Sequence, residues 1–365
     1  MKKILFISQY LNRAGTEAFM MSVFRGVDHA CFHVDFLLYS KQDTDYTREV
    51  EAAGCKVYRV PSRKESYWKW QRALDQFFKE HSAEYDAVHF CGNSLTTIAP
   101  LWYAYKYRVP IRICHAHNSS CRGLHNKVLH LMKRGLAKRI CTHYMACSTL
   151  AAKWFFGDAE AQIVANGIPV EQYRYNEAIR RKKRQELGIA PEERVIGHVG
   201  RFVMEKNHEF MLEVFAQCMR MTSPTSLLLV GTGPLMQKVR QKADELGVTD
   251  HVRFLGERSD VPELLQAMDV FFMPSLFEGL PYVLIEAQGA GLPCVISDVI
   301  NKDIVLTPSV YYASLEETKE SWAEKLVEVL KKKTDRPDST AWLAKAGYSV
   351  SDTLRQLEQI YASKS

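Results

Sequence analysis

Val270-Phe-Phe-Met-Pro-Ser-Leu-Phe-Glu-Gly-Leu-Pro-Tyr-Val-Leu-Ile-Glu286 is the stretch of the sequence that decides the fold. Its apolar start, residues 270–273, predicts a buried parallel strand. Gly279 and Pro281 predict a tight turn after that strand, and a helix is expected from Tyr282 onward. A strand, a turn and a helix in this order form one unit of a parallel α/β sheet.

Two glutamates of this unit, Glu278 and Glu286, predict a nucleotide-sugar site. The free N–H groups at the helix start can bind a diphosphate. One carboxylate could hold sugar hydroxyls on one side of that diphosphate, and the other could hold ribose hydroxyls on the opposite side. Two glutamates at this spacing also occur by chance, so the interpretation depends on the rest of the chain.

Apolar and amphipathic segments alternate along both halves of the chain, as the strands and helices of a doubly wound sheet do. In the first half the expected strands are residues 4–7, 34–38, 57–60, 87–90, 111–114 and 144–146, and the expected helices are residues 16–27, 68–81, 95–107 and 125–138. In the second half the expected strands are residues 195–199, 226–230, 252–255, 270–273, 294–297 and 310–313, and the expected helices are residues 207–221, 235–246, 261–268, 282–290, 317–332 and 351–362. The sequence therefore predicts an α/β protein with two Rossmann-like, doubly wound parallel-sheet domains.

The alternation is interrupted near Asn166-Gly-Ile-Pro169 by a polar, charge-rich stretch, which predicts a hinge. The expected organisation is a first domain at 1–165, a hinge at 166–184, a second domain at 185–348, and a helix at 349–365 that could cross back to the first domain. Open α/β sheets bind ligands at the carboxyl ends of their strands. The expected active site is therefore a cleft that both domains face.

Composition excludes several classes of protein. The chain has 365 residues, of which 47% are hydrophobic, and no stretch approaches the roughly 20 apolar residues of a membrane span. The apolar run after Lys3 is too short for a signal peptide and is expected to be the first strand. Nine cysteines without a Cys-x-x-Cys pair indicate reduced thiols in the cytoplasm, and their spacing matches no familiar zinc site. No nucleic-acid-binding motif is present.

The net charge of +6 is concentrated in the first 170 residues, which carry nine more positive than negative charges. Residues 124–140 and the segment around Trp68 and Trp70 combine basic side chains with apolar or aromatic ones. Such segments favour docking on an anionic membrane surface. The solvated outer faces of ordinary helices explain the same pattern equally well.

Four further motifs follow expected strands. Arg201 and Lys206 share the loop that begins at Gly200, and two cations at this spacing can bind both phosphates of a diphosphate. The other motifs are a glycine turn at Gly231-Thr-Gly233, a second glycine turn at Ala14-Gly15-Thr16-Glu17, and the segment His115-Ala-His117-Asn118. Each motif is common by itself, and a lone Gly-x-Gly falls short of a dinucleotide fingerprint, which argues against a dehydrogenase.

Taken in order, these motifs resemble the retaining glycosyltransferases of family four, whose two-Rossmann-domain architecture is called GT-B. The resemblance extends across nearly the whole chain and is most specific over residues 199–291. It looks closest to bacterial enzymes of exopolysaccharide, capsule and lipopolysaccharide assembly. The first domain would then bind the acceptor and the second the nucleotide-sugar donor.

The resemblance also implies roles for individual residues. Arg201 and Lys206 would neutralise the donor diphosphate, and His117 would lie beneath the transferred sugar. Glu278 would contact that sugar, and Glu286 would hold the ribose hydroxyls. The implied catalytic residues are His117, Arg201, Lys206 and Glu278. The implied donor-binding residues are Gly15, Gly200, Gly231, Gly233, Arg258, Ser275, Gly279, Leu280 and Glu286.

The implied reaction moves a hexosyl group from a nucleotide-diphosphate sugar to a hydroxyl of a glycan or lipid-linked saccharide, with retained anomeric configuration. A UDP-sugar is the favoured donor. No Asp-x-Asp motif stands where a metal would be needed, so neither a cofactor nor a metal is expected. The implied location is the cytoplasm, with contact to the inner face of the membrane through the basic first domain. A sugar-nucleotide epimerase of related fold and a non-catalytic sugar-nucleotide-binding protein stay open as alternatives.

Overall fold

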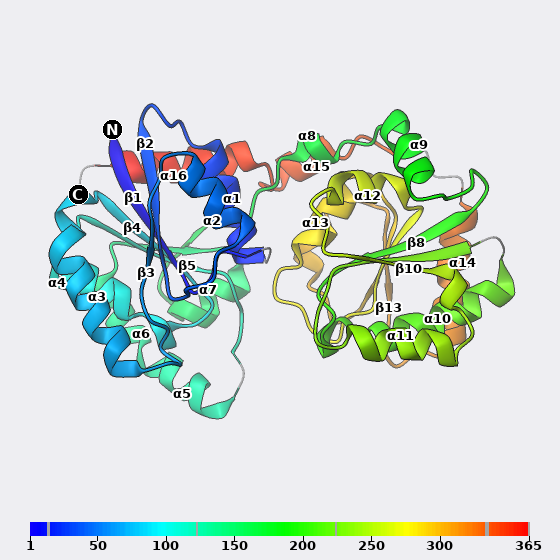
Figure 1. Cartoon of the computed structure of the whole chain (residues 1–365), viewed down its shortest axis with the longest axis horizontal. Coiled ribbons are helices and arrows are strands. Elements are labelled where there is room, and N and C mark those ends of the chain that lie inside the picture. Colours follow the sequence, from blue (N-terminus) through cyan, green and yellow to red (C-terminus); the bar gives the residue numbers. More distant parts are fainter. Residues whose placement is uncertain (13–14, 122, 223–224, 333–335, 364–365) are drawn as a thin grey trace. The chain divides into compact units, whose positions relative to one another are not determined.

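The computed structural model describes residues 1–12, 15–121, 123–222, 225–332 and 336–363. The chain forms two compact units (Figure 1), of which unit 1 comprises Met1–Ile168 with Gly347–Ser365 and unit 2 comprises Pro169–Ala346. Each unit is built around one parallel sheet. Arg13 and Ala14, which precede Gly15 in the first glycine turn, lie outside the described ranges.

Unit 1 holds a seven-stranded sheet in the order β3-β2-β1-β4-β5-β6-β7, and its paired strands all run parallel. The strands are β1 (Lys2–Ser8), β2 (Phe32–Leu38), β3 (Val57–Arg59), β4 (Ala87–Gly92), β5 (Ile111–Ala116), β6 (His143–Ala146) and β7 (Gln162–Ile163). The helices are α1 (Gly15–Gly26), α2 (Asp45–Ala52), α3 (Tyr67–His81), α4 (Ala99–Lys106), α5 (Leu124–Met132), α6 (Arg134–Ile140), α7 (Thr149–Phe156) and α16 (Val350–Ala362). The strand order changes direction between β1 and β4, which is where a doubly wound sheet binds its ligand.

Unit 2 holds a six-stranded parallel sheet in the order β10-β9-β8-β11-β12-β13. The strands are β8 (Arg194–Val199), β9 (Thr225–Val230), β10 (Val252–Gly256), β11 (Val270–Met273), β12 (Cys294–Ser297) and β13 (Val310–Ala313). The helices are α8 (Val170–Tyr173), α9 (Glu177–Glu186), α10 (His208–Met221), α11 (Met236–Glu245), α12 (Val261–Ala267), α13 (Tyr282–Gly289), α14 (Lys319–Lys331) and α15 (Thr340–Lys345). Here the direction changes between β8 and β11, and the carboxyl ends of these two strands mark the expected site.

The central strands are continuous apolar runs because helices cover parallel sheets on both faces. The side chains of residues 4–7 in β1 and 270–273 in β11 are fully buried. The predicted fold class, two doubly wound parallel-sheet domains, is confirmed.

Several expected elements differ from the structure. The helix expected over 125–138 is two helices, α5 and α6, which meet at Lys133. The helix expected from Leu95 begins only at Ala99, after a short 3-10 turn. The elements that the sequence pattern missed are β7, α2, α7, α8, α9 and α15.

Most of helix α9 lies in the stretch that was expected to be a hinge, and the structure places the helix in unit 2. Two of its arginines are held by contacts within unit 2. Arg180 Nη2 donates to Asp269 Oδ1 at 2.6 Å, and Arg184 Nη1 donates to the carbonyl oxygen of Ala267 at 3.0 Å. These arginines satisfy the carbonyl groups at the end of α12, so the polar sequence is part of the packed unit.

The last helix, α16, packs against α1 within unit 1. Leu354 lies against Gly26, where the absence of a side chain leaves it room. The hydroxyl of Tyr361 lies 2.7 Å from His89 Nδ1, in the core of the sheet. None of the helices in the described ranges combines the length and apolarity needed to span a bilayer.

Candidate functional site

In unit 2, the two loops that flank the change in strand direction bring Lys206 and Glu278 together. Lys206 ends a 3-10 turn after β8, and Glu278 lies in the loop after β11. Lys206 Nζ donates to Glu278 Oε1 at 2.6 Å, and the two side chains are only 17% and 10% exposed. The sequence predicted separate tasks for the two residues, whereas the structure joins them in one partly buried ion pair.

The second predicted cation, Arg201, begins the same loop and is exposed. Lys206 thus lies against the protein and Arg201 faces solvent. An arginine with a free guanidinium can bind a phosphate with two parallel hydrogen bonds, while a lysine acts as a point charge. The loop therefore offers both types of phosphate ligand on one side of the change in strand direction.

Helix α13 begins directly after the Glu278 loop. Pro281 is its N-cap and has no polar side-chain atom to cap the helix, and Gly279 and Leu280 before it are partly exposed. Backbone N–H groups at such a helix start can bind an anion. This end of unit 2 can therefore bind a diphosphate through backbone and side chains together.

Glu286 is the fifth residue of α13, a little over one turn from its start. It accepts a hydrogen bond from the hydroxyl of Tyr173 at 2.8 Å. Burial raises the pKa of Glu286 to about 6, and the Tyr173 hydrogen bond acts in the opposite direction. Tyr173 was not predicted, because it lies in the stretch expected to be a hinge and only the fold brings it to α13.

The glycine turn after β9 allows close approach of two loops. Gly231 has φ of +130° and its N–H donates to the carbonyl oxygen of Gly256 at 2.7 Å. A Cβ atom at Gly231 would collide with the carbonyl oxygen of Gly200, and one at Gly233 would collide with the backbone of Phe202. Both glycines are thus required by packing against the phosphate-binding loop, whatever they contribute to a ligand.

Two other predicted donor-binding residues are held by protein contacts. Arg258 donates through Nε and Nη2 to both carboxylate oxygens of Asp260, at 2.7 and 2.6 Å. Ser275 is fully buried, its carbonyl oxygen accepts from Ser297 Oγ at 2.6 Å, and its own hydroxyl has no hydrogen-bond partner within the described part of the chain. The Ser275 hydroxyl can therefore bind a ligand without breaking a contact within the protein, whereas the Arg258 guanidinium is paired with Asp260.

In unit 1, the corresponding change in strand direction is flanked by α1 and the loop after β4. Thr16 Oγ1, next to Gly15, donates to Asn93 Oδ1 at 3.3 Å across it. His117 follows β5 at the same edge of the sheet and is buried. Neither ring nitrogen of His117 has a hydrogen-bond partner among the described residues, and the same holds for the amide oxygen of the buried Asn166. Unpartnered buried polar atoms are costly, so a ligand group that supplied hydrogen bonds here would be favoured.

Burial lowers the pKa of His117 to about 3, while the nearby Asn166 acts in the opposite direction. His117 is therefore neutral at physiological pH and can both donate and accept one hydrogen bond. Such a ring suits a sugar hydroxyl better than a phosphate.

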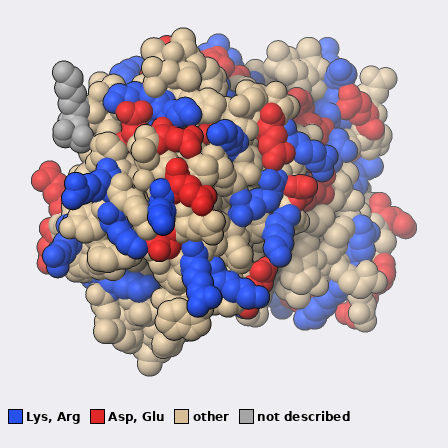
Figure 2. Space-filling view, turned by 60° about the vertical axis from the view of Figure 1, so that its left-hand side comes forward, with Lys and Arg blue, Asp and Glu red and all other residues tan. Residues whose placement is uncertain are grey.

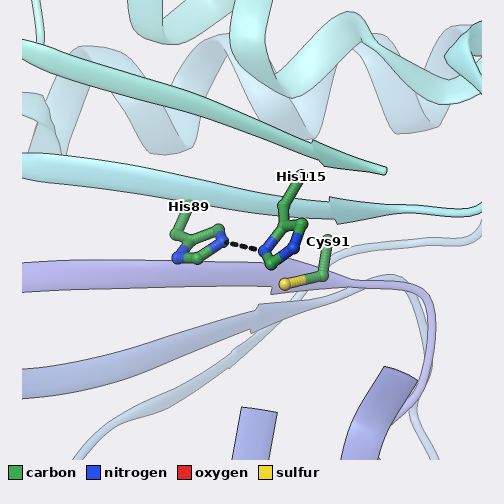
Figure 3. A group of neighbouring side chains, drawn as sticks. All are labelled: His89, Cys91 and His115. Atoms are coloured by element: carbon green, nitrogen blue, oxygen red, sulfur yellow. Dashed lines mark hydrogen bonds between the residues drawn. The ribbon is translucent and has the colours of Figure 1, made fainter. Parts of the chain in front are cut away.

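Behind His117 lies a group of buried side chains that could hold a metal ion, namely His89, Cys91 and His115 (Figure 3). His89 Nε2 lies 3.1 Å from His115 Nδ1, so these two nitrogens share a hydrogen bond, and His89 Nδ1 lies 2.7 Å from the Tyr361 hydroxyl. The rings of His115 and His117 lie 4.2 Å apart. Both ring nitrogens of His89 are thus engaged, while His115 Nε2 has no hydrogen-bond partner among the described residues. We interpret the group as a core network that supports His117.

Glu17 is a buried carboxylate that the sequence placed in a glycine turn without a role. It lies in the first turn of α1, and burial raises its pKa to about 7. The negative charge of Glu17 repels the thiolate of Cys91 on strand β4 and, together with burial, raises the pKa of that thiol. Glu17 thus lies beside the histidine group, at the edge of the sheet that also carries His117. Only its burial, which the sequence does not show, distinguishes it from an ordinary first-turn glutamate.

Glu17→Gln is expected to stabilise the folded protein above pH 7 by about 3 kcal/mol. The folded-state pKa of Glu17 lies above the unfolded value, so the folded state binds more protons between pH 4.5 and about 7. Stability is therefore lost as the pH rises through this window, and an uncharged glutamine avoids the loss. Denaturant unfolding of both proteins at pH 5 and pH 8 measures the difference. Equal stabilities at pH 8 would show that Glu17 has an ordinary pKa.

Comparison with known proteins identifies the family of this chain. The family model described as "Glycosyl transferases group 1" matches residues 179–348. The chain is 32% identical to the putative glycosyltransferase EpsF of Bacillus subtilis over 99% of this chain and 96% of that protein. It is 26% identical to an Escherichia coli UDP-Gal:α-D-GlcNAc-diphosphoundecaprenol α-1,3-galactosyltransferase, over 70% of this chain and 68% of that enzyme.

The fold is shared with solved structures. The crystal structure of Anabaena HepE in complex with UDP and glucose superposes with a TM-score of 0.82, at 19% identity and full coverage of both chains. WaaG, a glycosyltransferase involved in lipopolysaccharide biosynthesis, superposes with a TM-score of 0.71 at 20% identity, over 99% of this chain and all of that one. Because the match to EpsF spans nearly the whole of both chains, this chain belongs to the group 1 glycosyltransferases, with the GT-B fold and family-four type that its motifs predicted.

Proposed function

We propose that this glycosyltransferase moves a hexosyl group from a UDP-sugar to a hydroxyl of a glycan or lipid-linked saccharide, with retained anomeric configuration. The observation that carries the proposal is the Lys206–Glu278 pair beside the start of α13, where the strand order of unit 2 changes direction. A cation, a free helix start and a carboxylate at this point match the phosphates and hydroxyls of a nucleotide sugar.

Each residue then has a task in the transfer. Arg201, Lys206 and the backbone of Gly279 and Leu280 stabilise the negative charge that develops on the diphosphate as the bond to the sugar breaks. Positive charge from side chains and a helix start can replace a metal ion, so transfer is proposed to need none.

The carboxylates are proposed to bind hydroxyl groups rather than to attack the sugar. Glu278 is held by Lys206, which lowers its availability as a covalent nucleophile, and Glu286 is held by Tyr173. Retention without a covalent intermediate is then explained if the acceptor attacks from the face that the diphosphate leaves. The departing phosphate oxygen takes the acceptor proton, and the neutral His117 binds a sugar hydroxyl.

The relatives support the choice of donor and acceptor. HepE was solved with UDP and glucose, and the E. coli relative is named for a UDP-galactose donor and a diphosphoundecaprenol-linked acceptor. A third relative, 33% identical over 43% of this chain, is the Vi polysaccharide biosynthesis protein VipC/TviE of Salmonella typhi. We infer a role in cell-surface polysaccharide synthesis in the cytoplasm, at the inner face of the membrane that carries such an acceptor.

A thermal-shift panel of UDP, GDP and ADP and their sugars tests donor binding. At one hundred times its dissociation constant, UDP is expected to raise the melting temperature by about 5 °C, because a ligand that binds only the folded state stabilises it. The same panel with EDTA tests metal independence. If no nucleotide shifts the transition, donor binding is contradicted, and a shift that EDTA removes contradicts metal independence.

Incubation with the donor that shifts the melting temperature most, without any acceptor, separates the alternative functions. An epimerase converts this donor into a second nucleotide sugar, whereas a transferase releases nucleoside diphosphate slowly by hydrolysis and faster when an acceptor is added. Conversion to a second nucleotide sugar would overturn the proposed reaction. No turnover with any acceptor fraction from cells would favour a binding protein.

A further inference from the structure

Helix α5 of unit 1 carries its apolar face on the outside. The four apolar side chains Leu124, Val128, Leu131 and Met132 are 78%, 48%, 45% and 74% exposed. Their spacing of four, three and one residues puts them on one face of a helix, about 100° wide. In a helix that only covers a core, this is the face that would be buried.

The orientation of α5 is fixed by contacts on its other side. His130 is fully buried, its Nδ1 accepts from the N–H of Leu95 at 3.1 Å, and its ring stacks on Trp154 at 4.3 Å. A rotation that buried Leu124 or Met132 would remove His130 from these partners. The exposed apolar face is therefore a consequence of a specific anchor.

The surroundings of this face are basic. From Ala87 to Gly157 the sequence contains ten Lys and Arg residues and no Asp or Glu. Lys127 of α5 and Lys138 and Arg139 of the following helix α6 are exposed, whereas Lys133 and Arg134 donate to backbone carbonyl oxygens and hold the helix in place. Figure 2 shows the lower end of unit 1 as an uncharged projection with Lys and Arg above it.

We propose that the exposed apolar face of α5 inserts into the interface of an anionic lipid bilayer, with the basic side chains around it against the lipid headgroups. This docking rests on the proposed function in one respect, namely that a lipid-linked acceptor gives the enzyme a reason to be at a membrane. One apolar helix face flanked by basic side chains is sufficient for interfacial binding.

The chemistry of the patch favours a bilayer over other occupants. Four apolar side chains are too few for a stable protein–protein interface. A second copy of the same surface would bring two segments rich in Lys and Arg together, which costs free energy. The phosphates of a nucleic acid would pair with the Lys and Arg side chains, but the apolar face would stay uncovered.

Trp68 and Trp70 do not both belong to a docking surface. Trp68 is 73% exposed, but Trp70 is buried in the core and packs against Tyr39. The predicted aromatic contribution of this segment is therefore wrong for Trp70, and of the two segments expected to dock, α5 is the one that exposes an apolar face.

Vesicle flotation of the full-length chain tests the proposal, with vesicles of phosphatidylcholine alone and with 30% phosphatidylglycerol. Binding to the anionic vesicles is expected to be at least tenfold tighter and to weaken with salt. The double variant Leu124→Ser/Met132→Ser is expected to bind at least tenfold more weakly, and Lys127→Gln/Arg139→Gln to lose most of the preference for anionic lipid. The matched control is Ile179→Ser/Met221→Ser, which changes two exposed apolar side chains of unit 2 and is expected to bind like the wild type.

Unchanged binding of the α5 variant, or equal binding to both kinds of vesicle, would overturn the proposal. So would a dimer of the wild type that Leu124→Ser/Met132→Ser dissociates, because the face would then serve a second copy. The UDP thermal shift is measured on the same proteins and is expected to be equal in all of them. A missing shift in the wild type with intact vesicle binding would contradict the proposed function and leave the docking surface standing.

Discussion

Lys206→Ala is expected to lower the rate of glycosyl transfer about 10²–10³-fold, as does removal of one preorganised charge-stabilising group in other enzymes. The ammonium group belongs to the loop that is proposed to bind the diphosphate and donates to Glu278 at 2.6 Å. Its loss removes charge stabilisation and also leaves the partly buried Glu278 without its cation. Initial rates of sugar transfer at saturating donor measure the effect.

Arg201→Ala removes a cation from the same loop without removing the partner of Glu278. It therefore separates the loss of charge stabilisation from the loss of the Lys206–Glu278 ion pair. Arg201 is exposed, so its removal is expected to lower transfer without changing the stability of the fold. Lys331→Ala, at an exposed position of α14, is the control for the loss of a surface cation in unit 2. Transfer at the wild-type rate in both Lys206→Ala and Arg201→Ala would remove the two cations from the mechanism.

The fold was predictable where local pattern and burial agree. Strands β11, β12 and β13 have the predicted ends, residue for residue, because each is a short apolar run bounded by loop residues. Helix α9 was missed for the opposite reason: eight of its ten residues are polar or charged, and its helical state depends on arginines that bind α12 and Asp269. No periodicity in the sequence shows such a partner.

The sequence predicted which loops carry the site residues, but it did not predict which side chains contact one another. Residues after strands were expected at the carboxyl edge of each sheet, and the structure places Lys206, Glu278 and His117 there. The pairing of Lys206 with Glu278 depends on two loops separated by about seventy residues, which spacing alone does not relate. Tyr173 and Glu17 were given no role because a long-range hydrogen bond and burial, respectively, distinguish them.

The two units differ in the chemistry they present. Unit 2 offers cations, a helix start and carboxylates at its edge, which suits a charged donor. The edge of unit 1 offers a neutral imidazole, an amide and a protonatable carboxylate in Glu17, which suits hydroxyl groups. This difference supports the division of labour that the resemblance implied, with acceptor binding in unit 1 and donor binding in unit 2, which stays a prediction.

Glu286→Gln is expected to weaken UDP binding about 10- to 100-fold at pH 8, since hydrogen bonds to a charged group contribute about 1.5–3 kcal/mol. The ribose hydroxyls donate to a carboxylate, and a glutamine has only one oxygen to accept them. Burial raises the pKa of Glu286 to about 6, so the wild-type carboxylate is protonated as the pH falls below this value. UDP binding by the wild type is therefore expected to weaken below pH 6, and binding by Glu286→Gln to lose this dependence.

Tyr173→Phe and Glu17→Gln assign this pH dependence to one carboxylate. The Tyr173 hydroxyl donates to Glu286 and lowers its pKa, so its removal is expected to move the midpoint of UDP binding to higher pH. Glu17 titrates about one unit higher but lies in unit 1, and Glu17→Gln is expected to leave the midpoint near 6. Isothermal titration with UDP from pH 5 to pH 8 measures all four proteins. A midpoint that follows Glu17→Gln instead of Tyr173→Phe would assign the titration to unit 1 and remove Glu286 from the ribose.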